Sequence, residues 1–310
     1  MKKFIYFALS IILLGLTTSC TSDDNAMDKG YTTDSSTTKP TIKVIETKVE
    51  NFQFILYSNV KAFYAPSNNP VVVEIKDLND PTNTTFINTK MNVVMHMPTM
   101  THSAPMTQLQ PQKNVPNKFD GELMFTMSGT NLENNYWEVI IDSENKGKKL
   151  QTSFKLSVRD GKFYDRQDIN TIVNSDRKTL ETFNVNSQKH YAALHPIFNP
   201  KTGNNEVAVT IYRNEKMATE FPIVENLIVS IDPRMPDMGN HGVMEGVIEL
   251  SYNATTKQYE GTLPLSMTGY WFLNLVIKNQ SGEIVAGQPV AKDPYGKYTV
   301  NGDKFFDILF

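Results

Sequence analysis

The chain has 310 residues, a formal net charge of -3 and a single cysteine. Acidic and basic residues are mixed along it, which excludes the basic footprint of a nucleic-acid-binding protein, and one cysteine excludes an internal disulfide. The sequence holds no nucleophile elbow, metalloprotease helix, phosphate-binding glycine loop or paired-cysteine zinc motif, so we do not expect an enzyme.

The N-terminus predicts export and lipidation. Two lysines precede an apolar run, residues 4–16, that has the length of a signal peptide and is too short for a membrane span. The run ends in Leu16-Thr17-Thr18-Ser19-Cys20, which resembles a bacterial lipobox. Lipidation of Cys20 would explain why an exported chain keeps one unpaired cysteine. We therefore expect residues 1–19 to be a lipoprotein signal peptide and Cys20 to be the lipid anchor.

Residues 20–42 predict a flexible linker, because they are rich in Ser, Thr and Asp and poor in apolar side chains. Their opening, Thr21-Ser22-Asp23-Asp24, resembles the acidic signals that direct lipoproteins of Bacteroidota to the outer face of the outer membrane. We expect an outer-membrane protein exposed at the cell surface, with the periplasmic face as the alternative.

The rest of the chain contains an internal repeat, whose segments recur in the same order. The matching pairs are residues 68–75 with 204–211, 97–100 with 235–238, 119–129 with 259–269, and 136–137 with 270–271. We predict two domains, residues 43–157 and 183–293, joined by a connector, 158–182, and followed by a short tail, 294–310. A chain of this length also favours two cores over one.

Each repeat consists of short alternating or Val/Ile-rich runs that are broken by Asn, Gly and Pro. This pattern predicts an all-β protein with two tandem immunoglobulin-like β-sandwich domains, where the term refers to architecture alone. A helix is expected only at about residues 168–182.

Strand parity separates core side chains from exposed ones, because residues two apart share a face. It predicts that Met91 and Met95 lie in the core and that His96 faces solvent. Parity also favours Trp137 and Trp271 as core residues over a capping role above a metal site.

Met and His also gather where the apolar alternation stops and Pro, Thr, Gly, Asn and Ser predict a loop. An alignment without gaps pairs Met97, Met100 and Met106 with Met235, Met238 and Met244, and places His102 and His241 one position apart. Thioether sulfur and imidazole are ligands that Cu(I) favours, and outside the cytosol thioethers have an advantage over thiols, which there tend to form disulfides. Met127 and Met267, each just before a glycine turn, fit equally well as further ligands and as a last core layer.

Each Met-Pro-x-Met loop with its histidine, followed by a strand of the form Phe/Tyr-Asp/Glu-Gly-x-Leu, resembles the YtkA-like domain family, which is similar to FixH-type assembly proteins. The resemblance implies exported β-sandwiches that handle copper. It implicates as ligands Met97, Met100 and His102 in one repeat and Met235, Met238 and His241 in the other. Met106 and Met244 follow from the repeat alone.

We therefore expect a lipoprotein that binds Cu(I) through Met/His loops for copper acquisition, delivery or tolerance. Its partners would be the copper ion and a copper-accepting or copper-importing membrane protein. The alternative is a surface-tethered module that binds a protein or a glycan and holds no metal, with the Met-rich loops as an adaptable contact surface.

Overall fold

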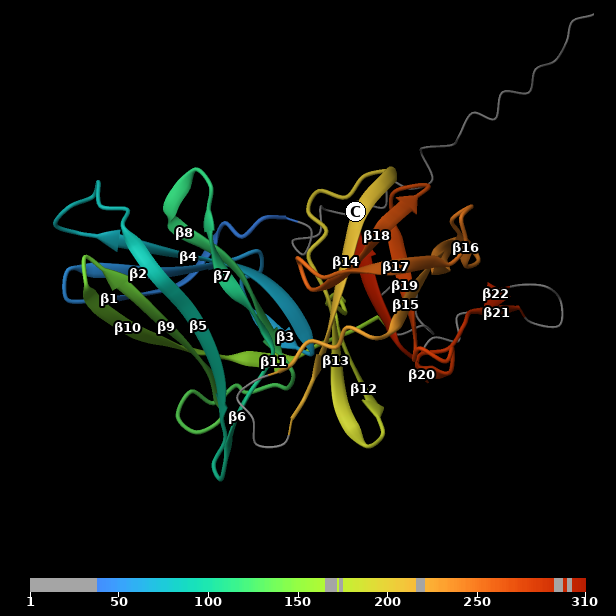
Figure 1. Ribbon diagram of the computed structural model, residues 1–310, viewed down its shortest axis with the longest axis horizontal. Helices are drawn as coiled ribbons and strands as arrows, with labels where there is room; N and C mark the ends of the chain where they lie inside the picture. Colours follow the sequence, from blue (N-terminus) through green and yellow to red (C-terminus); the bar gives the residue numbers. More distant parts are fainter. Residues whose placement is uncertain (1–37, 165–171, 173–174, 216–220, 293–297, 300–302) are drawn as a thin grey trace, which may run out of the picture. The chain divides into compact units, whose positions relative to one another are not determined.

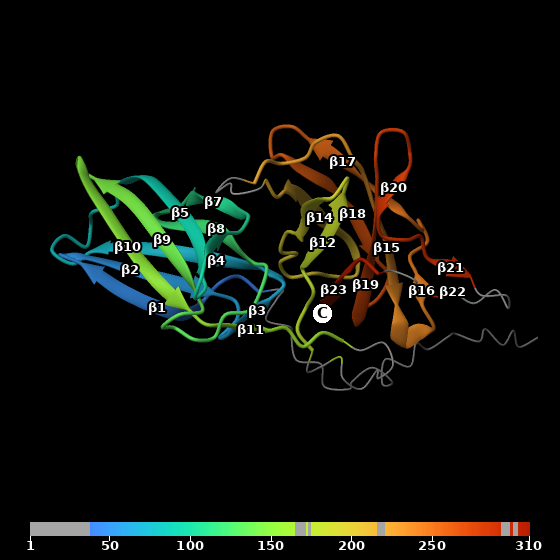
Figure 2. The ribbon, with the colours of Figure 1, turned by 90° about the horizontal axis from the view of Figure 1, so that it is seen from below.

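The alternating segments of the sequence form β-strands in the computed structural model (Figures 1 and 2). The structure describes residues 38–164, 172, 175–215, 221–292, 298–299 and 303–310, which belong to one compact unit, Tyr31–Phe310. These residues form strands and short 3-10 turns and no α-helix, so the predicted all-β class is confirmed. The predicted signal peptide, Cys20 and the linker up to residue 37 lie outside the described residues.

The first half of the molecule, built from β1 to β11, contains two facing sheets. One sheet has the order β1 (Ile42–Val49), β2 (Phe52–Ser58), β4 (Ser67–Asp77), β8 (Val115–Phe125) and β7 (Met106–Gln112). The other has the order β10 (Lys148–Leu156), β9 (Tyr136–Asn145), β5 (Phe86–His96) and β6 (Thr101–Ser103). A parallel pair, β3 (Phe63–Ala65) and β11 (Val158–Asp160), lies beside them.

The core of this half lies between the two sheets. Phe54 and Val73 from the first sheet and Val139 and Phe154 from the second belong to the same buried cluster. Strand β10 shows the cause, because every second residue from Leu150 onward is buried and the residues between are exposed. Apolar burial from both sheets therefore holds them face to face.

The second half, built from β12 to β23, repeats this strand order. Its pairing runs β12 (Leu180–Val185), β13 (Gln188–Leu194), β14 (Gly203–Arg213), β18 (Gln258–Leu265), β17 (Ile248–Asn253), β15 (Ile228–Met235), β19 (Tyr270–Lys278) and β20 (Ile284–Ala286). The order β12-β13-β14-β18-β17 corresponds to β1-β2-β4-β8-β7, and the pair β15-β19 corresponds to β5-β9. Here β17 pairs with both β18 and β15, which joins the two sheets into one.

Three short strands complete the second half. β16 (His241–Gly242) pairs with β15, and β21 (Ala291–Lys292) pairs with β22 (Tyr298–Thr299). β23 (Phe305–Leu309) pairs with β19 and is buried along its length. The predicted tail therefore ends in a core strand, because its apolar residues complete the sheet beside β19.

The predicted helix is wrong for the part of it that the structure describes. Residues 175–179 have no regular secondary structure. Leu180 begins β12, which pairs with β13, so the predicted helix ends in a strand instead. Residues 168–171 and 173–174 lie outside the described residues. The proposed domain boundaries stay a prediction.

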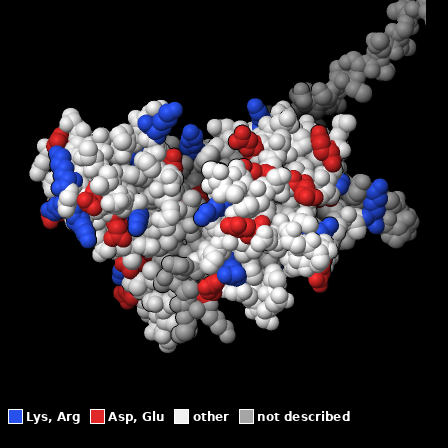
Figure 3. Space-filling model, in the orientation of Figure 1, with Lys and Arg blue, Asp and Glu red and all other residues white. Residues whose placement is uncertain are grey.

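No helix in the described ranges has the length and apolar character needed to cross a membrane. Lys and Arg side chains are interspersed with Asp and Glu on the face shown in Figure 3, as the mixed charge pattern of the sequence predicts.

Candidate metal-binding site

A tight hairpin after β5 brings His102 to the end of the first core. The backbone N–H of Met97 donates to the Met100 carbonyl over 2.9 Å and closes the turn, in which Pro98 supplies a fixed backbone dihedral. Strand β6 then returns along β5, so that His102 lies opposite Met95. Residues 97–100 are thus a loop, as predicted, whereas His102 lies in a short strand because it pairs with β5.

The imidazole of His102 faces the sulfur of Met127. Its Nδ1 lies 3.1 Å from the carbonyl oxygen of Ser103, and its Nε2 lies 3.2 Å from Sδ of Met127. A carbonyl only accepts hydrogen bonds, so in the neutral ring we assign the proton to Nδ1 and a free lone pair to Nε2. A thioether has no proton to donate either. In this tautomer two lone-pair donors face each other with no hydrogen between them.

This separation suits two ligands of one soft cation. Bonds of about 2.0 Å to nitrogen and about 2.3 Å to sulfur, as in tetrahedral zinc sites, put the two donor atoms roughly 3.5 Å apart. His102 and Met127 need to move by only a few tenths of an ångström to reach that spacing. In addition, a metal-bound histidine commonly donates its other N–H to a backbone carbonyl, which is the role that Ser103 plays here.

Trp137 contacts both His102 and Met127 from the core side. Its ring is fully buried and meets the His102 ring edge to face, with the centroids 5.7 Å apart. Its indole N–H donates to the Met127 carbonyl over 2.9 Å. The predicted core position of Trp137 is confirmed, and the same side chain also fixes the two residues above it.

The other methionines of the first half divide by burial. Met91 and Met95 are fully buried, as predicted. Met97 and Met106 are half-buried and pack against the same core, and Met106 lies in β7 opposite Leu123 instead of in a loop.

Met100 is 60% exposed and Met127 is 38% exposed, so both thioethers are accessible to solvent. The pair of donors that the structure brings into contact in this half is His102 and Met127.

Met235 differs from its expected role as a rim ligand. It is 1% exposed, it lies opposite His241 in the pairing of β15 with β16, and its terminal methyl packs against Gly269. Met95 has the same surroundings, because it lies opposite His102 and packs its methyl against Gly129. The structural counterpart of Met235 is therefore Met95 and not Met97, and the alignment without gaps is wrong by two residues here.

The second hairpin also has a different shape. A 3-10 turn, Pro236–Met238, follows β15, and the next two residues, Gly239 and Asn240, both have left-handed φ angles of 64° and 60°. Gly and Asn adopt this conformation at the least cost, which explains why they stand here. His241 then follows Met235 by one residue fewer than His102 follows Met95.

In this half, Met238 and Met244 are 50% and fully exposed, and His241 is exposed as well. Met267 is half-buried, and its carbonyl accepts a hydrogen bond of 3.1 Å from the indole of Trp271, as Met127 does from Trp137. Trp271 is fully buried, which confirms its predicted place. The framework of the first site is thus repeated, but the histidine and thioether are not brought together.

His96 is less solvated than its strand parity predicts. Its Nε2 lies 2.8 Å from a Glu138 carboxylate oxygen, and its ring stacks on Tyr136 with the centroids 4.8 Å apart. These contacts hold it on the outer face of β5, away from the core.

The role of the Ser103 carbonyl could not be predicted from the sequence, because every residue has a backbone carbonyl and none marks this one. Within the described part of the chain, no three side chains from among His, Cys, Asp and Glu are grouped to hold a metal ion. The donors found here include thioether sulfur, which belongs to none of those residue types.

No family model matches the chain, and no curated protein matches it closely. Among solved structures, the chain is similar to a DUF4785 family protein from Legionella pneumophila, with 9% sequence identity and a TM-score of 0.26. The match covers 82% of this chain and 58% of that protein, so the chain spans less than two thirds of its length.

Proposed function

We propose that this protein binds Cu(I) at the rim formed by His102 and Met127. The observation that carries the proposal is the contact between Nε2 and Sδ at 3.2 Å, with Nδ1 turned to a backbone carbonyl. Neutral imidazole and thioether are soft or borderline donors, so they favour Cu(I) over hard cations such as Ca²⁺. Met100, exposed on the adjoining turn, is the candidate for a third ligand.

We also propose that the two halves are tandem immunoglobulin-like sandwiches of the YtkA-like type. The shared strand order, the Trp-to-Met carbonyl hydrogen bond and the Met–His pairing across neighbouring strands in both halves support this proposal.

The chain would act outside the cytosol, as a lipoprotein anchored through Cys20 at the outer membrane and exposed at the cell surface. Since Met127 and Met100 are open to solvent, a bound ion could pass to a copper-accepting or copper-importing membrane protein. That exchange suits acquisition, delivery or tolerance better than permanent storage.

The test is competition for Cu(I) between the purified protein and a colorimetric chelator such as bicinchoninate under reducing conditions. Met127→Leu keeps the side-chain volume and removes the sulfur, and His102→Gln removes the imidazole. Each should weaken Cu(I) binding by about tenfold or more, because even loss of a hydrogen-bond partner behind a ligand typically costs about 10–100-fold in metal affinity. His96→Gln is the matched control, because His96 is a half-buried histidine of the same hairpin that pairs with Glu138.

Failure of the wild-type protein to withdraw Cu(I) from the chelator at any ratio would refute the proposal. Equal binding by the wild type, Met127→Leu and His102→Gln would refute the assignment of the site. A loss in His96→Gln as large as in His102→Gln would count against it too.

A second candidate function rests on the loop of the second half. Met244 is fully exposed and Val247 is 59% exposed, which is unusual for large apolar side chains and suits an adaptable contact surface. This candidate, an interaction module without metal, gains support if the chelator experiment fails. Met244→Ser would then abolish partner binding and leave the fold unchanged.

A further inference from the structure

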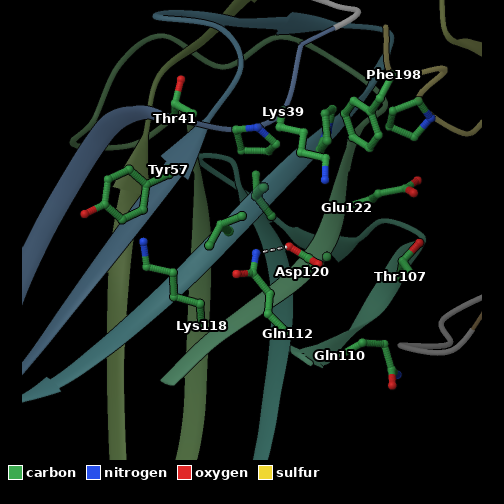
Figure 4. Close-up of a pocket in the computed structure, with 16 residues that line it drawn as sticks. Lys39, Thr41, Tyr57, Thr107, Gln110, Gln112, Lys118, Asp120, Glu122 and Phe198 are labelled. Atoms are coloured by element: carbon green, nitrogen blue, oxygen red, sulfur yellow. Dashed lines mark hydrogen bonds between the residues drawn. The ribbon is translucent and has the colours of Figure 1, made fainter. Parts of the chain in front are cut away.

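A cavity of about 580 Å³ lies on the outer face of the β1-β2-β4-β8-β7 sheet (Figure 4). Its volume is within the range of small-molecule sites. A row of paired residues crosses it, from Tyr57 on β2 to Val72 on β4, Asp120 on β8 and Gln110 on β7. Val73, next along β4, lies in the core, so strand parity directs this row away from the core.

Two segments outside the sheet wall the cavity. Lys39 and its neighbours lie just before β1, and Phe198 lies in the connection between β13 and β14. Phe198 is 38% exposed. In Figure 4 the rings of Tyr57 and Phe198 lie at opposite sides of the cavity, with polar side chains between them. The cavity thus has an aromatic ring at each side and, between them, polar side chains together with the apolar Pro70, Val71 and Val72.

The charges that line the cavity cancel, because two lysines, Lys39 and Lys118, oppose two carboxylates, Asp120 and Glu122. Both carboxylates already have partners. Asp120 accepts a hydrogen bond of 2.6 Å from the Gln112 side chain.

Glu122 lies 2.8 Å from Nδ1 of the buried His195. A ligand of either sign would add an uncompensated charge to this balanced set, whereas a neutral polar ligand would not.

We propose that this cavity binds a short neutral oligosaccharide. Sugar hydroxyls both donate and accept hydrogen bonds, so they match a lining of amide, carboxylate and ammonium groups. The C–H face of a sugar ring is apolar and packs on an aromatic ring such as that of Phe198. The Tyr57 ring already has Lys118 Nζ over it, 5.5 Å from the ring centroid. The site is separate from His102 and Met127, neither of which lines the cavity.

The experiment titrates the purified protein with cellotriose, maltotriose, mannotriose and triacetylchitotriose, using calorimetry and saturation-transfer NMR. At least one of these neutral sugars should bind. Phe198→Ala should weaken that binding about tenfold or more through loss of the stacking surface. Gln110→Ala should weaken it about fivefold through loss of hydrogen bonds.

Two matched controls lie outside the cavity. Gln108 is an exposed glutamine of the same strand, and Ile87 is a 54% exposed apolar residue, so Gln108→Ala and Ile87→Ala should bind as the wild type does. Because Phe198 and Gln110 are exposed, their variants should keep the wild-type melting temperature.

Trigalacturonic acid and trialanine serve as charged and peptide probes. Binding of either in preference to every neutral sugar overturns the proposal, as does the absence of any sugar binding. Sugar binding that Phe198→Ala and Gln110→Ala leave unchanged would also overturn it, because the ligand would then lie elsewhere.

Discussion

Met95 and Met235 occupy the same position in the two halves of the molecule. Each is buried, lies opposite a histidine on the neighbouring strand and packs its terminal methyl against a glycine. The methionine beneath each histidine is therefore part of the packing, and the ligands of any metal must come from side chains nearer the solvent.

The contacts of Gly129 and Gly269 predict that an alanine substitution destabilises the protein at both positions, and more strongly at Gly269. A Cβ at Gly129 would lie 2.7 Å from Cε of Met95, and one at Gly269 would lie 2.8 Å from Cε of Met235. Gly269 also has a φ of +129°, which side chains rarely adopt. Gly129→Ala should therefore cost about 1–2 kcal/mol of unfolding free energy by overpacking, and Gly269→Ala about 1 kcal/mol more.

Urea denaturation measures both costs. Gly282→Ala is the control for backbone strain alone, because Gly282 has a φ of +84° and no atom lies within 4 Å of its Cβ position. A Gly269→Ala variant no less stable than Gly282→Ala would contradict the packing contact with Met235.

Tryptophan fluorescence should locate bound metal, since the chain has two tryptophans and only Trp137 touches the donor pair. In Trp271→Phe, the emission of Trp137 should change in proportion to added Cu(I) and saturate. In Trp137→Phe, the emission of Trp271 should stay nearly constant. A response confined to Trp271 would place the metal in the second half.

Stability should fall as the pH rises above neutrality because of His195. Burial by itself lowers the pKa of His195, but Glu122, at 2.8 Å from Nδ1, and the more weakly acting Glu260 together hold this pKa above its ordinary value. The protonated ring is thus favoured in the folded state. Its contribution to stability is complete below the unfolded-state pKa of about 6.5 and is lost as the pH rises through the higher folded-state value.

Glu122→Gln tests this link by urea denaturation between pH 5 and 9. It should lower the unfolding free energy at pH 6 by about 3 kcal/mol and flatten the decline above pH 7. Burial lowers the pKa of His190, so its effect appears as the pH falls below about 6.5 and leaves the decline above pH 7 to His195. A decline that persists in Glu122→Gln would rule out His195 as its source.

Strand β23 should be required for the stability of the second half. Phe306 is fully buried and lies opposite Leu273 on β19. Phe306→Ala should cost about 3–5 kcal/mol of unfolding free energy, as loss of a large core side chain does. Phe198→Ala, at an exposed phenylalanine, should cost less than about 0.5 kcal/mol in the same assay.

Strand parity predicted the buried places of Met91, Met95, Trp137 and Trp271, because a two-residue period reports which face of a sheet a residue occupies. The repeat likewise predicted the shared strand order of the two halves. Strand parity is a local pattern, and the repeat is a match between two segments of the same chain. A single sequence contains both.

The sequence marked His102 and Met127 as candidate ligands, but it did not predict that they are in contact. His102 and Met127 lie 25 residues apart, on a short strand and on a turn, and their contact depends on how two hairpins pack above Trp137. The mismatch at Met235 has a similar cause, because the turns after β5 and β15 differ by one residue and an alignment without gaps cannot show which residues pair. The cavity at Tyr57 and Phe198 joins segments that are far apart in the chain.

Strand β17 pairs with a strand of each layer, and this pairing affects how the second half responds to force. Its first three residues pair with β15 and its last three pair with β18, so the hydrogen-bonded ladder continues from one layer to the other without a break. The exposed segment around Met244 leads directly into this strand. A force applied to that segment would act on the hydrogen bonds of β17 to both β15 and β18 at the same time. The second half should therefore resist separation of its two layers at β17 more strongly than the first half, whose two layers share no strand.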